Sequence, residues 1–132
     1  MTTISDVDGK LLHMIVRSIP KGRINLCDND QFLQCASLRL EKGTTFRPHQ
    51  HNWNHFEGLK IAQEAWIIIK GSVLVTYFDT KGNNIFSDII TAGEASFTFE
   101  GGHNYEILED DTIVYEFKSG PYIGQQHDKS FI

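Results

Sequence analysis

The sequence predicts an all-β protein built as a sandwich or barrel. Glycines divide its 132 residues into short runs that are rich in β-branched and aromatic side chains. Turn signals recur at the spacing of about 8–12 residues that is typical of such folds. No repeat, linker or low-complexity segment interrupts this pattern. The length suits one domain with one hydrophobic core.

In chain order, strands are expected over 31–40, 44–47, 64–69, 72–79, 84–90, 95–99, 104–108 and 112–118. Each run has the β-branched and aromatic content of a strand and is bounded by turn residues. Lys81-Gly82-Asn83-Asn84 and Glu109-Asp110-Asp111 are typical of hairpin turns. We therefore expect an N-terminal arm over 1–30, a barrel core over about 31–119 and a C-terminal tail over 120–132.

The arm holds the one helical candidate. Asp6 or Asp8 could cap a helix that continues through Leu11 to Ile15. The same pattern also fits a strand. The expectation for this segment is a short helical or irregular stretch.

Composition excludes several classes of function. The formal net charge is −5 and no basic block is present, which disfavours binding to nucleic acid or to an anionic membrane. No apolar run approaches the roughly 18–20 residues of a membrane span. The acidic N-terminus does not resemble a secretory signal, so we expect a cytoplasmic protein. Cys27 and Cys35 are too few for a disulfide scaffold and are expected to be reduced.

Four residues form a candidate metal site. His49 and His51 are two apart, which places them on one face of a strand. Glu64 opens an apolar strand that ends at Gly71, and His103 follows a pair of glycines. Three imidazoles and a carboxylate suit Fe(II), Mn(II), Ni(II), Co(II) or Zn(II), and would leave two positions of an octahedral ion open. One divalent ion is therefore the expected cofactor.

These residues resemble the two motifs of the cupin superfamily, G-x5-H-x-H-x3–4-E-x6-G and G-x5-P-x-G-x2-H-x3-N. The match runs from Gly43 through His49 and His51, resumes over Glu64 and Gly71, and follows the second motif loosely over Gly93, Gly101 and His103. The resemblance implies a cupin jelly-roll barrel. It also implies that His49, His51, Glu64 and His103 bind the metal.

The chain departs from these motifs in its spacing. Twelve residues separate His51 from Glu64, where cupins have three or four, and Phe99 replaces the proline of the second motif. Glu57 lies nearer the usual spacing and is the alternative ligand. Glu64 is preferred because Gly71 follows it at the expected distance, whereas Glu57 lies in a segment with loop composition.

A narrower resemblance is carried by short segments along much of the chain. The segments are Arg23-Ile24-Asn25-Leu26, Arg47-Pro48-His49-Gln50-His51, Ile68-Ile69-Lys70-Gly71, Tyr77-Phe78-Asp79 with Gly82, Glu116-Phe117-Lys118, Gly120-Pro121-Tyr122 and Asp128-Lys129 with Phe131. They are similar to the WbuC-type cupin metalloproteins, which accompany surface-polysaccharide and sugar-nucleotide genes. The resemblance implies a link to polysaccharide biosynthesis, with a sugar or sugar nucleotide as ligand.

Further candidates surround the metal site. The long loop over 52–63 joins ligand-bearing strands, so its His55, Trp53 and Phe56 are candidates for catalysis or for stacking on a sugar ring. The loop could equally be a surface hairpin whose aromatic side chains cover the core. Arg47 could bind an anionic substrate or lie in solvent.

Strand periodicity predicts which residues line the barrel. Tyr105 shares the face of His103, and Trp66 and Ile68 share the face of Glu64, so all should point inward while Glu106 points outward. Tyr105 is a candidate proton donor, or a core tyrosine whose hydroxyl is bonded inside. Trp66 is a candidate substrate contact.

Such a centre supports several activities. With Zn, Mn or Ni the ion acts as a Lewis acid, which favours an isomerase or epimerase; with Fe(II) a dioxygenase is expected. We favour a metal-dependent enzyme acting on a small sugar-derived or carbonyl-bearing molecule. The alternative is a non-catalytic small-molecule-binding cupin linked to surface-polysaccharide metabolism. We also expect a homodimer, with the first thirty residues exchanged or packed between subunits.

Overall fold

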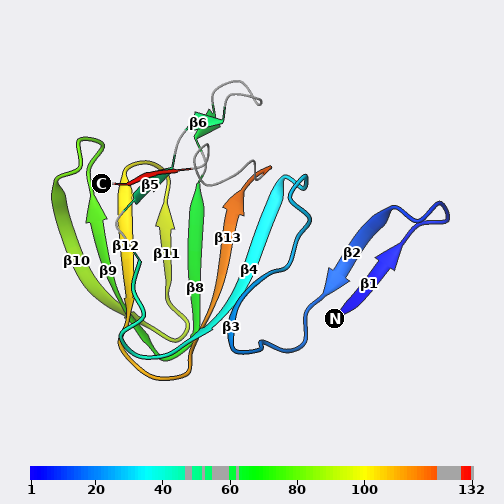
Figure 1. Cartoon of the computed structure of the whole chain (residues 1–132), viewed down its shortest axis with the longest axis horizontal. Helices are drawn as coiled ribbons and strands as arrows, with labels where there is room; N and C mark the ends of the chain where they lie inside the picture. Colours follow the sequence, from blue (N-terminus) through cyan, green and yellow to red (C-terminus); the bar gives the residue numbers. More distant parts are fainter. Residues whose placement is uncertain (47–48, 52, 55–59, 62, 122–128, 132) are drawn as a thin grey trace.

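Two five-stranded antiparallel sheets face each other and form an open barrel (Figure 1). The computed structural model describes residues 1–46, 49–51, 53–54, 60–61, 63–121 and 129–131. One sheet has the strand order β10-β9-β12-β5-β14, and the other has the order β11-β8-β13-β4-β3. This arrangement confirms the predicted all-β class.

Seven of the eight predicted runs are strands. The first sheet contains β5 (His49–His51), β9 (Ser72–Phe78), β10 (Asn84–Thr91), β12 (Gly102–Ile107) and β14 (Lys129–Phe131). The second contains β3 (Gly22–Asn25), β4 (Leu33–Leu40), β8 (Glu64–Lys70), β11 (Ala95–Thr98) and β13 (Thr112–Ser119). Two short hairpins complete the fold: β1 (Thr2–Ser5) with β2 (Leu11–Ile15), and β6 (Trp53–Asn54) with β7 (Lys60–Ile61).

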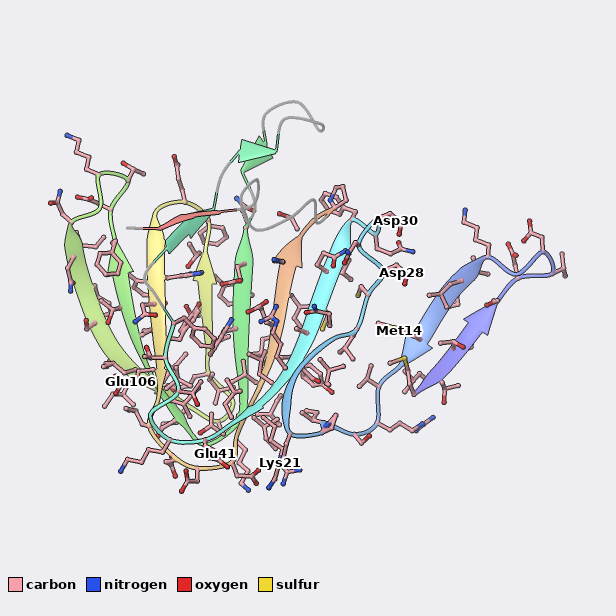
Figure 2. The ribbon with its side chains drawn as sticks, in the orientation of Figure 1. Met14, Lys21, Asp28, Asp30, Glu41 and Glu106 are labelled. Carbon is pink, nitrogen blue, oxygen red and sulfur yellow. The ribbon has the colours of Figure 1, made fainter. Side chains whose placement is uncertain are left out.

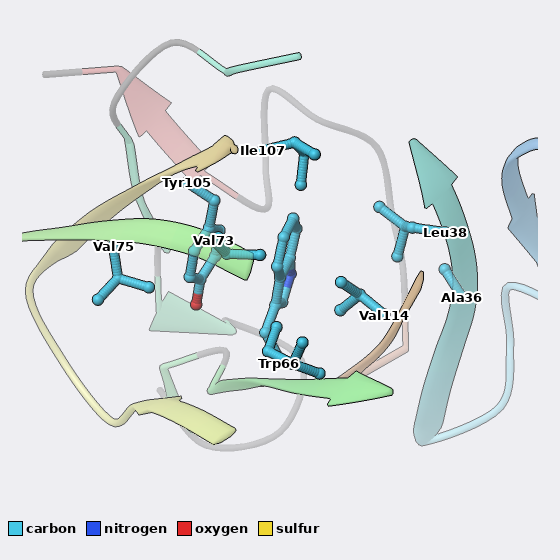
Figure 3. Close-up of a cluster of buried hydrophobic side chains, with 9 residues drawn as sticks. Ala36, Leu38, Trp66, Val73, Val75, Tyr105, Ile107 and Val114 are labelled. Atoms are coloured by element: carbon cyan, nitrogen blue, oxygen red, sulfur yellow. The ribbon is translucent and has the colours of Figure 1, made fainter. Parts of the chain in front are cut away.

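The hydrophobic core lies between the two sheets (Figure 3). Alternate residues of β4, β8 and β13 meet alternate residues of β9 and β12, as the period of two in a strand requires. Trp66, Ile68 and Tyr105 are buried, and Glu106 is exposed, which confirms the predicted inward and outward faces. The core members are Ala36, Leu38, Trp66, Ile68, Val73, Val75, Tyr105, Ile107 and Val114.

The N-terminal segment is a β-hairpin, so the expectation of a helical or irregular stretch was wrong. Asp6 does not cap a helix; its carboxylate accepts hydrogen bonds from the backbone N–H groups of Asp8 and Lys10, both at 3.3 Å. Gly9 has a φ of 87°, which closes the turn between β1 and β2. The strand alternative for Leu11–Ile15 is the one that the structure adopts.

The predicted strand over 44–47 also differs from the structure. Thr45 forms only an isolated bridge with Glu106, so a strand over 44–47 is not found in its described part.

Cys27 and Cys35 are both free thiols and half-buried. Within the part of the chain that the structure describes, no helix is long and apolar enough to cross a membrane.

Candidate metal centre

Glu64, Thr98 and His103 lie at one end of the barrel, the upper end in Figure 1. Glu64 is the first residue of β8 and Thr98 is the last of β11, and the two are paired in register. His103 is the second residue of β12, in the opposite sheet. All three occupy inward positions, so facing sheets bring their side chains together.

Glu64 and His103 are in direct contact. The His103 Nε2 atom lies 2.8 Å from Glu64 Oε2, and the His103 and Glu64 side chains are only 0% and 5% exposed respectively. A carboxylate and an imidazole removed from water are costly unless each has a polar or ionic partner. The buried contact is therefore the most specific chemical feature of this end of the barrel.

Thr98 fixes the orientation of the His103 ring. Its Oγ1 atom lies 2.8 Å from His103 Nδ1. When Nδ1–H donates to this hydroxyl, the lone pair of Nε2 faces the Glu64 carboxylate. Two electron-pair donors then point at the same place, which is the arrangement that a cation requires.

β5 brings the two other predicted ligands to the same end. His49 is paired in register with His103, and Gln50 with Gly102. His51 lies two residues beyond His49 on the same strand and pairs with Lys129 of β14. The side chains of His49 and His51 are outside the described part of the structure. Among the side chains that it does describe, no third His, Cys, Asp or Glu joins Glu64 and His103 in a metal-binding group.

Tyr105 extends the site into the barrel. Its ring stacks on Trp66, with centroids 3.9 Å apart and planes 12° from parallel, and its centroid lies 4.9 Å from that of His103. The hydroxyl is 3.1 Å from Ser96 Oγ, which is in turn 2.6 Å from the Tyr77 hydroxyl. Burial, followed by the charge of Glu64, raises the pKa of Tyr105 well above its usual value, so the phenol stays protonated at neutral pH.

A second buried carboxylate, Glu116 on β13, is in contact with Trp66. Glu116 Oε2 accepts a hydrogen bond from the Trp66 indole N–H at 2.9 Å. Arg23 of β3 donates to both oxygens of Glu116, at 3.2 and 2.6 Å. Phe46 meets Trp66 edge-on, with centroids 5.9 Å apart. These contacts bury Trp66 within the core, so its ring is not exposed to solvent.

Several predicted site residues lie outside the described residues. These are Arg47, His55, Phe56 and the alternative ligand Glu57. Trp53 lies in β6 by its backbone, and its side chain is also outside the description. β6 is at the same end of the barrel as β5 (Figure 1).

Sequence reasoning missed five polar residues that contact this set. Ser96 and Thr98 alternate along β11, so a period-of-two reading of that strand would have placed both inside the barrel. The same reading applied to β13 would have placed Glu116 inside. Applied to β9, the reading would also have placed Tyr77 inside, because it follows the buried Val73 and Val75 at a spacing of two. Arg23 carries no such signal, because its partner is 93 residues away in sequence.

Comparison with known proteins identifies the fold. No family model and no curated protein matches the sequence. Among solved structures, CapF bound to the inhibitor 3-isopropenyl-tropolone superposes with a TM-score of 0.66 at 16% identity, over 89% of this chain and 34% of that one. A point variant of the oxalate decarboxylase of Bacillus subtilis superposes with a TM-score of 0.64 at 19% identity, over 91% of this chain and 34% of that one. KdgF from Halomonas sp. superposes with a TM-score of 0.58 at 18% identity, over 79% of this chain and 81% of that one.

These neighbours are cupin-fold proteins, and this chain has the cupin jelly-roll fold. The chain spans about a third of the length of CapF and of oxalate decarboxylase, and most of the length of KdgF. At such low identity the likeness shows the fold alone. The chemistry of the site must be argued from its own residues.

Proposed function

We propose that this protein is a metal-dependent enzyme of the isomerase or epimerase type, acting on a small sugar-derived molecule that bears a carbonyl group. One divalent ion would be held by His49, His51, Glu64 and His103. The observation that carries the proposal is the buried contact between His103 Nε2 and Glu64 Oε2 at 2.8 Å. The register of β5, which pairs His49 with His103, supports it.

The donor set fits such an ion. The contact of Thr98 with Nδ1 keeps Nε2 of His103 turned toward the Glu64 carboxylate, and neither the His103 nor the Glu64 side chain is exposed enough for water to satisfy it. Imidazole and carboxylate donors together suit Fe(II), Mn(II), Ni(II), Co(II) or Zn(II). When bound, the ion supplies Lewis-acid polarisation of a substrate carbonyl.

Tyr105 favours proton transfer as the reaction. Its hydroxyl is protonated and is linked through Ser96 to the half-buried Tyr77, and its ring centroid lies 4.9 Å from that of His103. Isomerases and epimerases move a proton at the carbon beside a carbonyl, and they need a positioned acid or base besides the ligands. In this proposal Tyr105 holds the proton, and Ser96 fixes the direction of its hydroxyl.

The substrate class rests on two likenesses. The similarity of short segments to WbuC-type cupins points to a sugar or sugar nucleotide. Among the structural neighbours, oxalate decarboxylase is named for a reaction of a small, oxygen-rich acid. A carbonyl-bearing sugar derivative combines both features.

Exchange with heavy water tests this function. Protein loaded with each of the five candidate metals is incubated in D2O with a panel of sugars, sugar acids and sugar nucleotides, and the products are followed by NMR. We expect deuterium to enter one substrate beside its carbonyl, with the rate reduced at least tenfold in Tyr105→Phe. The matched control Tyr115→Phe alters a tyrosine on the outer face of the barrel and should keep the wild-type rate. Turnover that consumes dioxygen without exchange, or no turnover on the whole panel, contradicts the assignment.

A further inference from the structure

All the sulfur-bearing side chains of this protein line one groove. The sequence has two cysteines and two methionines, and all four line the groove between the N-terminal hairpin and strands β4 and β13: Met1, Met14, Cys27 and Cys35. Sulfur is scarce in the chain, so its gathering at one place is a specific feature. The groove lies on the outside of the barrel, away from the buried pair of Glu64 and His103.

The two thiols occupy neighbouring positions on adjacent segments of the barrel. Leu26 N–H donates to Cys35 O at 2.9 Å, which continues the pairing of β3 with β4 one residue beyond Asn25. Cys27 is the next residue, so the antiparallel arrangement places it beside Cys35. Both thiols are free and half-buried. One wall of the groove therefore carries a close pair of thiols.

The two thioethers share one face of the hairpin. Met14 pairs with Thr3, and Met1 lies two residues before Thr3. Paired residues and residues two apart along a strand point to the same side, and all three of these side chains line the groove. Figure 2 labels Met14 on the hairpin and Asp28, the residue after Cys27, on the barrel side of the groove. Thioethers on one wall thus face thiols on the other.

The thiol of Cys35 is protonated at neutral pH. Burial raises the pKa of Cys35 to about 11, and the charges of Cys27 and Glu116 act in the same direction. A thiol that is scarcely ionised reacts slowly with peroxides and disulfides, because the thiolate is the nucleophile. The pair is therefore poorly suited to form a disulfide. A thiophilic metal ion needs no thiolate in advance, since it takes the place of the proton.

We propose that Cys27, Cys35 and Met14 form a second metal site, which binds one Cu(I) ion in this groove. Thiolate and thioether sulfurs are the soft donors that select Cu(I). Structural zinc sites and iron–sulfur clusters use four thiolate or imidazole ligands, and the described side chains offer no group of even three His, Cys, Asp or Glu residues. On binding, each cysteine releases a proton to solvent and forms a Cu–S bond, Met14 donates a sulfur lone pair, and the copper remains Cu(I).

The bound ion joins the hairpin to the barrel. Among the described strands, β1 and β2 pair only with each other. A lone two-stranded hairpin is at best marginally stable in water. A bond from Met14 to an ion that is held by the two thiols of the barrel fixes the hairpin against β4. Copper should therefore slow hydrogen exchange of the backbone in Leu11–Ile15.

Competition with the Cu(I) chelator bathocuproine disulfonate tests the site. The full chain, reduced and free of oxygen, is titrated with Cu(I) in the presence of the chelator, and the coloured complex reports the copper that the protein does not hold. We expect the protein to retain one equivalent. Cys27→Ser and Cys35→Ser should each lose it, and Met14→Leu should release it at a lower chelator concentration. The matched control is the double variant His49→Ala with His51→Ala, which should keep the equivalent because it alters only the proposed divalent centre.

X-ray absorption at the copper edge guards against variants that lose the ion by misfolding. It uses the wild-type protein and should show sulfur ligands only. Nitrogen or oxygen ligands overturn the proposal, and so does a wild type that yields all its copper to the chelator. Retention of copper by both serine variants, or unchanged binding by Met14→Leu, contradicts the three-sulfur site. Loss of copper from the double histidine variant would place the ion in the barrel instead. None of these results depends on enzymatic activity, so they leave the proposed function to its own test.

Discussion

At the scale of single residues, the Thr98 hydroxyl determines which nitrogen of His103 faces Glu64. A histidine ring can turn and can exchange tautomers, and either change would move the Nε2 lone pair away from a bound cation. The hydrogen bond between Thr98 Oγ1 and His103 Nδ1 opposes rotation of the ring from a buried position. Groups that orient a metal ligand in this way commonly contribute about 10–100-fold to affinity.

Substitution of Thr98 should therefore weaken metal binding without removing a ligand. Thr98→Val keeps the shape of the side chain but loses the hydroxyl, and we expect the dissociation constant to rise about tenfold. Thr98→Ser keeps the hydroxyl and should bind almost as the wild type does. Competition with a coloured chelator measures both constants. Equal affinity of Thr98→Val and wild type would show that the hydroxyl does not orient His103.

The free energy of unfolding is expected to depend on pH through Asp111. It adopts a φ of 61° in the turn before β13, and its carboxylate accepts hydrogen bonds from Arg39 and from Lys70, the latter at 2.8 Å. These cationic donors lower the pKa of Asp111 from 3.8 to about 2. The contacts therefore stabilise the fold above pH 3.8, and this contribution is lost as the pH falls toward 2.

Asp111→Asn should remove that pH dependence while keeping the turn, because asparagine tolerates a positive φ. Urea unfolding of both proteins above pH 3.8 and near pH 2 gives the comparison. We expect the difference in free energy of unfolding between wild type and variant to be largest at the higher pH and to shrink as Asp111 becomes protonated. A difference that stays constant across this range would mean that the carboxylate charge contributes nothing to stability.

At the scale of elements, the turn between β8 and β9 joins the two sheets of the barrel. Gly71 occupies it with a φ of +90°, and a Cβ atom there would lie 2.9 Å from Thr112 Cβ. Thr112 is fully buried, and its hydroxyl donates to Glu109 O at 2.8 Å, so it has little room to shift. Glycine is therefore required at position 71 for two reasons: the positive φ of the turn, and the close approach of Thr112.

Gly71→Ala should lower the free energy of unfolding by about 3 kcal/mol, from the strained φ and the clash together. Gly93→Ala is the matched control, since Gly93 has a φ of +88° and no atom within 4 Å of its added Cβ. That variant should lose only about 1 kcal/mol. Equal losses of unfolding free energy in the two variants, measured by chemical denaturation, would show that Thr112 can move aside without destabilising the fold.

The elements also show where sequence reasoning succeeds and where it stops. Alternation along β8 and β12 placed Trp66 and Tyr105 inside, because one buried face enforces a period of two. The N-terminal hairpin was not resolved from sequence because Leu11–Ile15 fits either a helix or a strand, and Asp6 can begin either a helix or a turn. The contact of Arg23 with Glu116 was not predictable, since it depends on β3 and β13 both pairing with β4.

At the scale of the whole molecule, the two sheets gather at one end residues that are distant in sequence. β8 and β11 bring Glu64 and Thr98 from one sheet, and β5 and β12 bring His49 and His103 from the other. The sequence predicted a metal site on His49, His51, Glu64 and His103, and the structure brings Glu64 and His103 into contact. The supporting hydroxyls and the Glu116 ion pair emerge only when the sheets are placed face to face.

Metal content tests the central claim most directly. Protein purified without chelator, from media supplemented with each candidate metal, is analysed for its elements. The wild type and His13→Ala, an exposed histidine of the hairpin, should each contain one equivalent of a divalent ion. His103→Ala, and the double variant His49→Ala with His51→Ala, should contain almost none. A wild type that is free of metal in every medium, or variants that keep a full equivalent, would contradict the proposed centre.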